Sequence, residues 1–520
     1  MGSLETEKLV QDSLSDHHKP PPPPSAATAF QPKASNNNLF ALLLEPIQWL
    51  QMLSANLNPT FVLGVFIVYG LNQGFAGSFF KVVSDFYWKD VQRVNPSSVQ
   101  LYSGLYYIPW VMKPLWGLLT DVFPVMGYRR RPYFVAAGVL GAASATAVAA
   151  GGRLPVPEAL AFLVGLTAAV AIADVTIDAC VARNSIEMAV LAPDMQSLCG
   201  LCSSAGALIG YSTSGFFVHH IGAQGALGIL AIPSALLIVL GFIIHESRTD
   251  DLHSEKKKKA MDKIGAATRG MYETIRLPQV WKPSLYMYLS FSLNISTHEG
   301  QFYWYTNPEA GPAFSQEFVG MVYAVGALAS MVGVLIYQKT LKDCSFRKLL
   351  FFAQLLYGAT GMLDLIFVLR WNLALGVPDS FFVIAEECVS RVVSRIRWMP
   401  MIVLSTKLCP LGIEGTFFAL LMCIDSLGFL SSKMGGGLVL HLMHVTRTDF
   451  RNLWLALLVR NALRLATLGL IFLVPEGEQS DVIVTSGGLT NKNGSTEDGG
   501  GDEEEGLQLV PASEKSEVQH

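Results

Sequence analysis

Charged residues are scarce in this sequence. Asp, Glu, Lys and Arg make up 15% of its 520 residues, whereas hydrophobic residues make up 51%. Soluble domains carry about 25% charged residues, so this chain has too little polar surface for soluble domains of its size. The mean hydropathy of +0.39 instead favours an integral membrane protein. The formal net charge of -4 gives no indication of a nucleic-acid partner.

Motifs of enzyme chemistry are also missing. Neither H-E-x-x-H nor G-x-S-x-G occurs, and no G-x-x-x-x-G-K-[ST] supplies a P-loop through which ATP could drive transport. Of the seven cysteines, only Cys199 and Cys202 form a C-x-x-C, and no second pair completes a zinc site. We therefore predict a protein that is not an enzyme and that uses no metal and no cofactor.

What the sequence does contain is a series of hydrophobic runs about 20 residues long, the length that spans a bilayer as a helix. Six runs precede a polar loop with the basic run Lys256 to Lys259, and six more follow it. The predicted spans are 60–80, 99–119, 132–151, 158–182, 194–218, 224–245, 283–305, 315–338, 346–370, 378–404, 413–433 and 452–474. This pattern predicts an all-α, multi-pass membrane protein with about twelve transmembrane helices.

The same pattern divides the chain into five parts. Residues 1–58 are predicted to be a disordered tail followed by a short interfacial helix, since Glu45 and Pro46 interrupt the first apolar run. Residues 59–245 and 282–475 are two six-helix lobes, 246–281 is a basic linker, and 476–520 is an acidic disordered tail. Basic residues concentrate in the connections of one side, among them Arg129 to Arg131. The positive-inside rule then places that side, the linker and both termini in the cytosol, although it does not identify the membrane.

The two halves share weak internal similarity. Ile172-Ala-Asp174 in the fourth span is matched by Ile384-Ala-Glu386 in the tenth, and Arg183 by Arg395 at the same offset. Parallel repeats of this kind form two lobes related by an axis along the membrane normal, with a binding site near the midplane.

Two spans carry several charges at membrane depth. Asp174 and Asp178 lie one helical turn apart in the fourth span, where a carboxylate costs about 2.5 to 3.5 kcal/mol on insertion scales. They are expected to face a cavity or to bind a proton. In a purely structural role, they would instead pair with a basic residue on a neighbouring helix. In the tenth span, Glu387, Arg391 and Arg395 repeat at i, i+4, so acid and base can pair along one face.

Three stretches carry a resemblance to a known family. KPLWGLLTDVFPVMGYRRRPYF (Lys113 to Phe134), IADVTIDACVARNS (Ile172 to Ser185) and LCPLGIEGTFFALL (Leu408 to Leu421) resemble the folate-biopterin transporter family of the major facilitator superfamily. The resemblance extends over all twelve spans. It implies the major facilitator arrangement of two lobes and a carrier for folates or pterins. In this sequence five residues separate Asp121 from Gly127 in the loop after the second helix. The corresponding loop of the wider superfamily is shorter.

The resemblance also suggests roles for the charged residues. Carboxylates can accept the adjacent N–H donors of a pterin edge, and arginine forks match the carboxylates of a glutamate tail. Where helix two meets the cytosol, a carboxylate and basic residues can act as a gate between the lobes. The candidates for binding substrate or protons are Asp174, Asp178, Glu386, Glu387, Arg391, Arg395 and Glu299, and those for gating are Asp121, Arg129 and Arg131.

Alternative functions stay open from the sequence alone. Glu299 with Trp304 and Tyr305 can supply charge and stacking, but aromatic residues near helix ends more often form interfacial belts. The scaffold can carry a different small organic solute, or serve as a non-transporting sensor or enzyme. A channel is a further alternative, although intramembrane acids in both halves favour alternating access, with protons as a possible coupling ion.

Overall fold

The structure is a computed structural model. It describes residues 39–188, 191–246, 274–341, 344–408 and 414–476, together with positions 248, 269 and 272. The chain separates into two compact units, residues 1–484 and 485–520, and all described residues belong to the first. The predicted tails and the Lys256 loop lie outside the described residues. Within the described ranges the chain is almost entirely helical, with one isolated bridge between Val125 and Tyr128.

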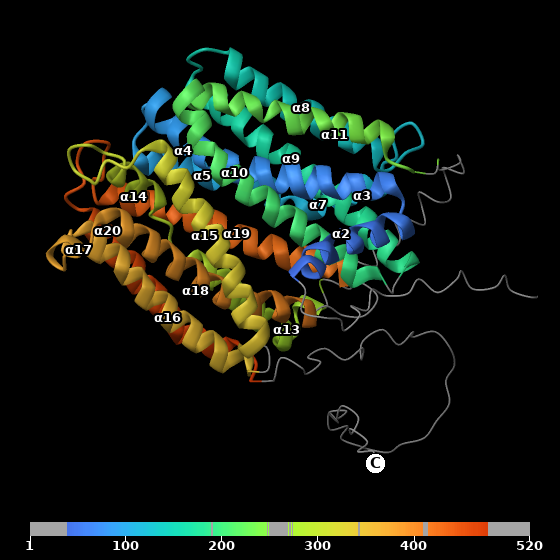
Figure 1. Cartoon of the computed structure of the whole chain (residues 1–520). Helices are drawn as coiled ribbons and strands as arrows, with labels where there is room; N and C mark the ends of the chain where they lie inside the picture. Colours follow the sequence, from blue (N-terminus) through green and yellow to red (C-terminus); the bar gives the residue numbers. More distant parts are fainter. Residues whose placement is uncertain are drawn as a thin grey trace, which may run out of the picture. The chain divides into compact units, whose positions relative to one another are not determined.

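The helical segments of the first half follow one another along the chain, some of them end to end (Figure 1). They are α2 (Leu39–Asn56), α3 (Pro59–Val65), the π-helical η1 (Phe66–Ala76), α4 (Gly77–Phe86), η2 (Tyr87–Val91), α5 (Pro96–Leu105), α6 (Ile108–Val111), α7 (Lys113–Val122), α8 (Arg131–Ala150), α9 (Val156–Glu187), α10 (Ala192–Ile229) and α11 (Ala231–Ile243). Gly222, at φ 74°, breaks α10 in the predicted connection between spans five and six. Only glycine adopts this conformation readily, so the chain can reverse there.

The second half repeats this arrangement. Its helices are α13 (Pro278–Ser292), α14 (His298–Tyr305), α15 (Gln316–Ile336), η4 (Tyr337–Leu341), α16 (Phe346–Val368), α17 (Trp371–Ala374), α18 (Asp379–Lys407), α19 (Glu414–Leu442), α20 (Leu453–Ala466) and the 3₁₀ segment η5 (Thr467–Leu473). Each predicted span therefore has a helical counterpart. Seven described helical segments are long and apolar enough to cross a membrane by length and composition, and the longest, Asp194–Ile243, contains the Gly222 turn.

Two predicted spans are broken instead of continuous. The second consists of α5, α6 and α7, because Pro109 and Pro114 each begin a new helix. The seventh is interrupted between α13 and α14, around Asn294 to Thr297. Irregular backbone at membrane depth is tolerated where it lines a cavity, and Asn294 to Thr297 do line one.

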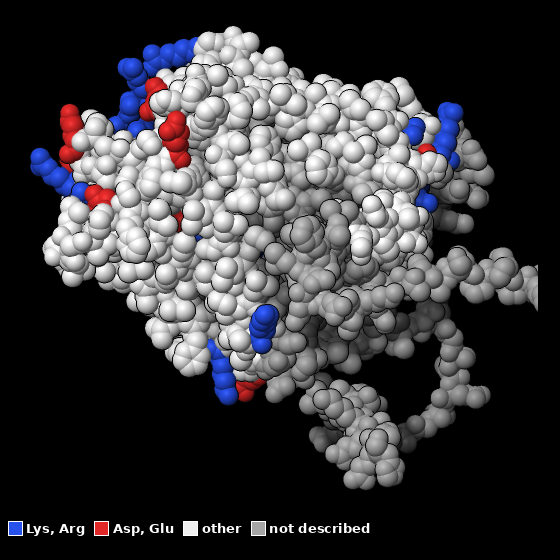
Figure 2. All heavy atoms as spheres, in the orientation of Figure 1, with Lys and Arg blue, Asp and Glu red and all other residues white. Residues whose placement is uncertain are grey.

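Charged side chains lie mainly at the ends of the bundle (Figure 2). The face in that view has a broad uncharged surface between them, as expected for helices that contact lipid tails. We call the end with the α7–α8 connection the basic end. The far end has the η2–α5, α14–α15 and α19–α20 connections.

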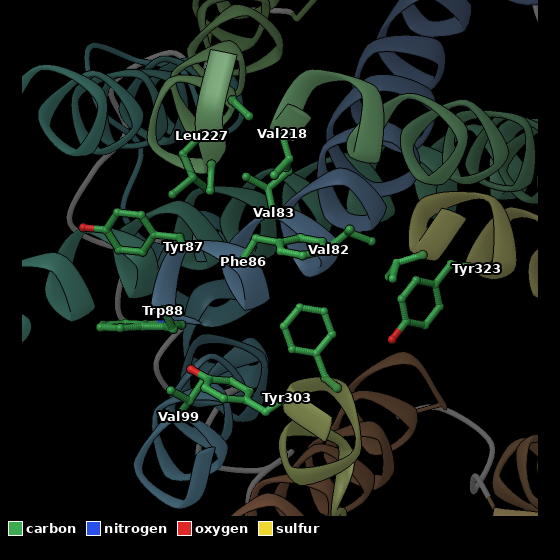
Figure 3. Packing of buried hydrophobic residues seen from close by; sticks show 14 of the residues in the cluster. Val82, Val83, Phe86, Tyr87, Trp88, Val99, Val218, Leu227, Tyr303 and Tyr323 are labelled. Carbon is green, nitrogen blue, oxygen red and sulfur yellow. The ribbon is translucent and has the colours of Figure 1, made fainter. Parts of the chain in front are cut away.

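The buried apolar residues form three clusters. One cluster at the far end joins both halves, where the rings of Phe86 and Phe302 meet edge to face at 4.9 Å between centroids. Figure 3 shows Val82 and Val83 of the first half in this cluster with Tyr303 and Tyr323 of the second. The other two clusters each belong to one half, with residues between 53 and 244 in one and between 280 and 474 in the other. Among described residues, the halves thus share an apolar core only at the far end.

Glycines allow the closest helix contacts. A Cβ on Gly206 of α10 would lie 2.0 Å from the carbonyl oxygen of Gly70 in η1, and one on Gly210 would lie 2.5 Å from that of Phe75. The Gly206-x-x-x-Gly210 spacing thus lets α10 and η1 approach closely, as small residues four apart do in membrane helices. Across the halves, α10 packs against α15, as Figure 1 shows, and Gly215 lies against the backbone of Gln316.

Candidate functional site

Two adjoining cavities lie within the bundle. The first, of about 390 Å³, is lined mainly by the second half, including α15, α16, α18 and α20. The second, of about 340 Å³, is lined mainly by the first half. Both are lined by Lys81, Tyr107, His298 and Lys433, which come from both halves. The two cavities therefore adjoin at the boundary between the halves, where the repeat pattern predicts a site.

The first cavity has an acidic wall formed by α18. Glu387 pairs with Arg391 at 2.6 Å between Oε1 and Nε, which is the pairing that the i, i+4 spacing predicts. Glu386 lines the same cavity and forms no ion pair or hydrogen bond with any described residue. Arg395 is directed elsewhere, because its Nε donates to Ser330 Oγ at 2.9 Å and it is absent from the cavity lining.

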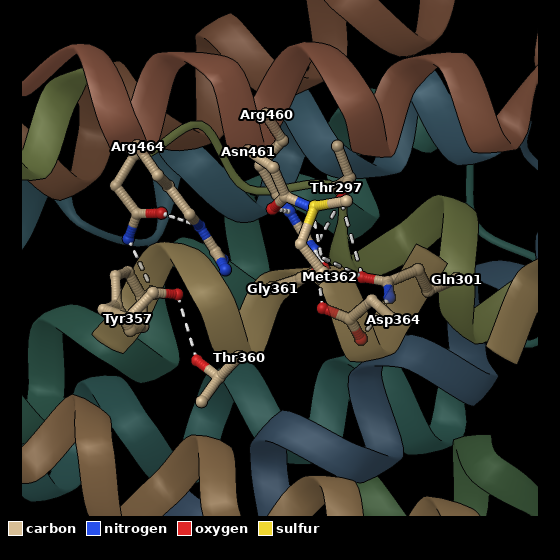
Figure 4. A network of polar contacts seen from close by, with 11 residues as sticks. Thr297, Gln301, Tyr357, Thr360, Gly361, Met362, Asp364, Arg460, Asn461 and Arg464 are labelled. Carbon is tan, nitrogen blue, oxygen red and sulfur yellow. Dashed lines mark hydrogen bonds and ion pairs between the residues drawn. The ribbon is translucent and has the colours of Figure 1, made fainter. Parts of the chain in front are cut away.

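A second wall of this cavity is basic (Figure 4). Arg460, 3% exposed, pairs with Asp364 at 2.5 Å and donates to Gln301 Oε1 at 3.1 Å. Gln301 in turn donates to Asp364 at 2.8 Å. Arg464, one turn along α20, donates from Nε to Asn294 Oδ1 at 2.6 Å. Each of these side chains is held by hydrogen bonds, so the wall is preorganised before any ligand arrives.

Aromatic rings complete the first cavity. Trp304, Tyr305 and Tyr323 all line it, and Trp304 is only 4% exposed. The interfacial-belt interpretation is therefore wrong for Trp304 and Tyr305, because both lie inside the bundle. Rings in such a cavity provide flat surfaces on which a planar heterocycle can stack.

A compact acidic cluster lies where the two cavities meet. Asp85 of α4 pairs with His298 of α14 at 2.9 Å, and Glu299 is fully buried with neither carboxylate oxygen hydrogen-bonded. Ligand atoms of these three residues lie within 4.8 Å of one another, a spacing that can hold a metal ion. Lys81 and Lys433 line the same cavity, and their positive charges oppose a cation there. Carboxylate and imidazole groups are also side chains that can exchange protons.

Asp174 and Asp178 lie outside the lining of both cavities. Asp174 is 1% exposed, pairs with Lys113 of α7 at 2.5 Å and accepts from Gln73 at 3.1 Å. Asp178 is exposed and accepts a hydrogen bond from Tyr69. In this conformation Asp174 therefore has the basic partner on a neighbouring helix that a structural role requires.

The predicted gate residues Asp121, Arg129 and Arg131 make their contacts within the first half, each with other residues. Asp121 pairs at 2.5 Å with Arg130, while the side chain of Arg129 is exposed. The Glu246 carboxylate accepts from the backbone N–H groups of Arg129, at 2.7 Å, and of Arg130 and Arg131. Arg131 also donates from Nε to the carbonyl of Ile244 at 2.8 Å. These contacts tie the α7–α8 connection to the end of α11.

The far end is closed by polar contacts between the halves. Arg447 donates to the carbonyl oxygens of Lys89, at 3.0 Å, and Arg93, at 3.2 Å. Lys89 donates to Thr306 Oγ1 at 2.6 Å, and Tyr303 donates to the carbonyl of Val94 at 3.0 Å. Together with the shared apolar cluster, these bonds join the two halves at that end.

Sequence reasoning missed several residues of the site. Asp85 and Lys81 lie in a stretch that extends the first span beyond its predicted end at residue 80, so their depth was not recognised. Arg460 and Arg464 are not among the predicted site residues, although they lie one turn apart within the predicted twelfth span. The rule that drew attention to Asp174, that a charge at membrane depth is usually functional, identifies both arginines as well.

Comparison with known proteins gives consistent results. The chain matches the model of the BT1 family over residues 73–493. It is 61% identical over 498 residues to the Arabidopsis thaliana protein named "Probable folate-biopterin transporter 6", covering 95% of this chain and 97% of that protein. It is 30% identical over 399 residues to the "Folate-biopterin transporter" of Synechocystis sp., covering 76% of this chain and 78% of that protein.

Solved structures show the fold. The nucleoside transporter NupG is similar with a TM-score of 0.58 at 13% identity, over 80% of this chain and 99% of that chain. This likeness confirms the predicted fold of the major facilitator type. The family and the relatives are those of transporters, which confirms the prediction that the chain is not an enzyme.

Proposed function

The chain belongs to the BT1 family, and from this membership we propose that it is a secondary transporter that moves folates or related pterins across a membrane by alternating access. The observation that carries the proposal is the pair of charged cavities at the boundary between the halves. A purely structural bundle has no reason to bury so many charges around open space, since each is costly to desolvate. The names of the relatives supply the substrate class.

The first cavity has the groups that a folate requires. Glu386 has no described partner, so its carboxylate is free to accept the adjacent N–H donors of a pterin ring. The ring can stack on the aromatic side chains beside it, of which Tyr323 is one. Arg391 is held by Glu387 at one side and can orient that carboxylate toward the same ligand. Asp174, Asp178 and Arg395 then support the site from outside its lining.

Alternating access requires that the cavity open to one side at a time. We infer that the halves 59–245 and 282–475 rock as two lobes about the cavity, and that the contacts of Arg447 break when the far end opens. The separate apolar clusters at the basic end are consistent with a cavity that faces that end in this conformation. Asp121, Arg129 and Arg131 would close the basic end in the opposite state.

Proton coupling is part of the proposal. Asp85, His298 and Glu299 join α4 of one half to α14 of the other, so a proton gained or lost there changes the attraction between the halves. Such a group can link proton movement to the opening of either end.

Orientation follows from the basic connections. We place the basic end, the linker and both termini in the cytosol. Single cysteines at Lys257→Cys and Ser516→Cys, both outside the described residues, should react with an impermeant thiol reagent only after permeabilisation. Labelling of either one in intact cells would reverse the assignment.

Uptake into vesicles tests the function. Proteoliposomes should accumulate labelled folate or biopterin, each inhibited by an excess of the other, and should ignore an unrelated anion such as lactate. A proton gradient should change the extent of accumulation. Transport of an unrelated solute with no uptake of either pterin compound would move the chain to a different substrate on the same scaffold. No transport of any solute would favour a sensor.

A further inference from the structure

Three arginines are buried close together in the second half. Arg397, Arg460 and Arg464 are 4%, 3% and 9% exposed. Arg460 has Asp364 as its carboxylate partner, and Arg397 is satisfied by Gln354 Oε1 at 2.5 Å and by the carbonyl of Ser290 at 2.8 Å. Arg464 has no carboxylate partner among the described residues. A buried charge without a counter-charge is costly, so the imbalance at Arg464 requires an explanation.

The surroundings of Arg464 fix its position without neutralising it. Its Nε donates to Asn294, which in turn donates to Tyr357 Oη at 2.9 Å. The guanidinium lies 4.4 Å from the centre of the Tyr357 ring. Figure 4 shows its free end between Tyr357 and Gly361, and neither terminal nitrogen donates to a described residue. Because Arg464 lines the first cavity, these nitrogens are available to a ligand.

Other charges around the cavity do not remove this excess. Asp364 is already bonded to Arg460 and Gln301, and Glu387 is already bonded to Arg391. Glu386 lines the same cavity but makes no contact with Arg464. The guanidinium thus presents two parallel N–H donors and one uncompensated positive charge, which match a carboxylate in a bidentate manner.

We propose that Arg464, positioned by Asn294 and Tyr357, is the subsite for a carboxylate of the transported solute, with Arg460 adding a second positive charge one turn away. This inference rests on the proposed function and narrows it. The pterin ring is recognised elsewhere in the cavity, and Arg464 recognises the glutamate tail that folates have and simple pterins lack. The subsite therefore determines how strongly the protein prefers folates over pterins without a carboxylate.

Arg464→Gln tests this by removing the charge while keeping a donor for Asn294. The proteins are purified as full chains and reconstituted, and apparent affinities are measured for folate and for biopterin. The variant should bind folate about 10- to 100-fold more weakly, the usual effect of losing a charged hydrogen bond, and biopterin within about threefold. Arg464→Lys keeps the charge but not the two parallel N–H donors. Its affinity for folate should fall between those of the wild type and of Arg464→Gln.

Arg397→Gln is the matched control. It removes another buried arginine that packs against the same Tyr357 ring, at 4.9 Å, but does not line either cavity. It should lower thermal stability and leave the ratio of folate to biopterin affinity unchanged. If Arg464→Gln weakens both substrates equally, as a structural defect would, the proposal is wrong.

Direct binding separates this proposal from the proposed function. p-Aminobenzoylglutamate has the glutamate tail but no pterin, and it should raise the melting temperature of the wild-type protein and not that of Arg464→Gln. Equal stabilisation of both proteins by p-aminobenzoylglutamate would overturn the subsite. The subsite would also be overturned if inorganic phosphate raised the melting temperature of the wild-type protein by as much as p-aminobenzoylglutamate does. If wild-type vesicles take up neither folate nor biopterin, the proposed function fails, while this binding result still decides the role of Arg464.

Discussion

Arg447 should control the closure of the far end. It bridges the halves through two hydrogen bonds, to the carbonyl oxygens of Lys89 at 3.0 Å and Arg93 at 3.2 Å. When the far end opens, these two bonds break and the carbonyl oxygens bind water instead. Arg447→Ala therefore removes both bonds from the closed conformation and none from the open one. We therefore expect the variant to destabilise the conformation closed at the far end relative to the one open there.

The size of the effect follows from the geometry. Arg447 is half-buried, so we assign each bond about 1 kcal/mol, the typical net contribution of a protein hydrogen bond, and not the larger contribution of a fully buried bond to a charged group. A loss of about 2 kcal/mol changes the ratio of the two conformations about 30-fold. A state open at the far end that is populated at about 1% in the wild type would then rise to about one quarter of the molecules.

Thiol labelling in the cavity measures this change. Ser390 lines the first cavity, so Ser390→Cys reports access from either end. With an impermeant reagent on the far-end side, labelling should be about tenfold or more faster when Arg447→Ala is also present. Arg451→Ala is the matched control, since the Arg451 side chain is 91% exposed and, among the described residues, forms an ion pair with Asp449 alone, at 3.9 Å. A change of less than twofold, or an equal change with the control, would show that Arg447 does not hold the far end closed.

Two further predictions concern stability. Asp174→Asn leaves Lys113 without its partner in a mostly buried place and should lower the unfolding free energy by about 3 kcal/mol, seen as a lower melting temperature in detergent. Adding Lys113→Met should recover part of this loss, and no recovery would mean that the pair is not the cause. Gly206→Val should prevent folding, so that no monodisperse protein is recovered by size-exclusion chromatography, because a Cβ there would lie 2.0 Å from the Gly70 carbonyl oxygen. Gly200→Val is the control and should fold normally, since a Cβ at Gly200 would meet open space.

The fold could be predicted from the sequence because lipid imposes a simple rule. Apolar runs of about 20 residues must be helices, so the order of helices follows directly from hydropathy. The breaks were harder to predict. Pro109 lies in the second predicted span, but nothing in the apolar pattern shows that the chain unwinds between α13 and α14, where Asn294 satisfies its polar groups through Tyr357 and Arg464.

The site could be predicted only in part. Local spacing gave the Glu387–Arg391 pair, because both residues lie on one helix. It could not give the pairing of Asp174 with Lys113, which depends on how α9 packs against α7. The cluster of Asp85, His298 and Glu299 likewise combines residues more than 200 positions apart, so only tertiary structure brings them together.

Counterflow tests the central claim most directly. Proteoliposomes loaded with unlabelled folate and diluted into a trace of labelled folate should accumulate the label transiently above its equilibrium level, because a carrier with a cavity that alternates between sides exchanges one molecule for another. Loading with biopterin should also drive accumulation of labelled folate. If the labelled folate accumulates no further than in liposomes loaded with lactate, the account of this chain as a folate and pterin carrier is contradicted.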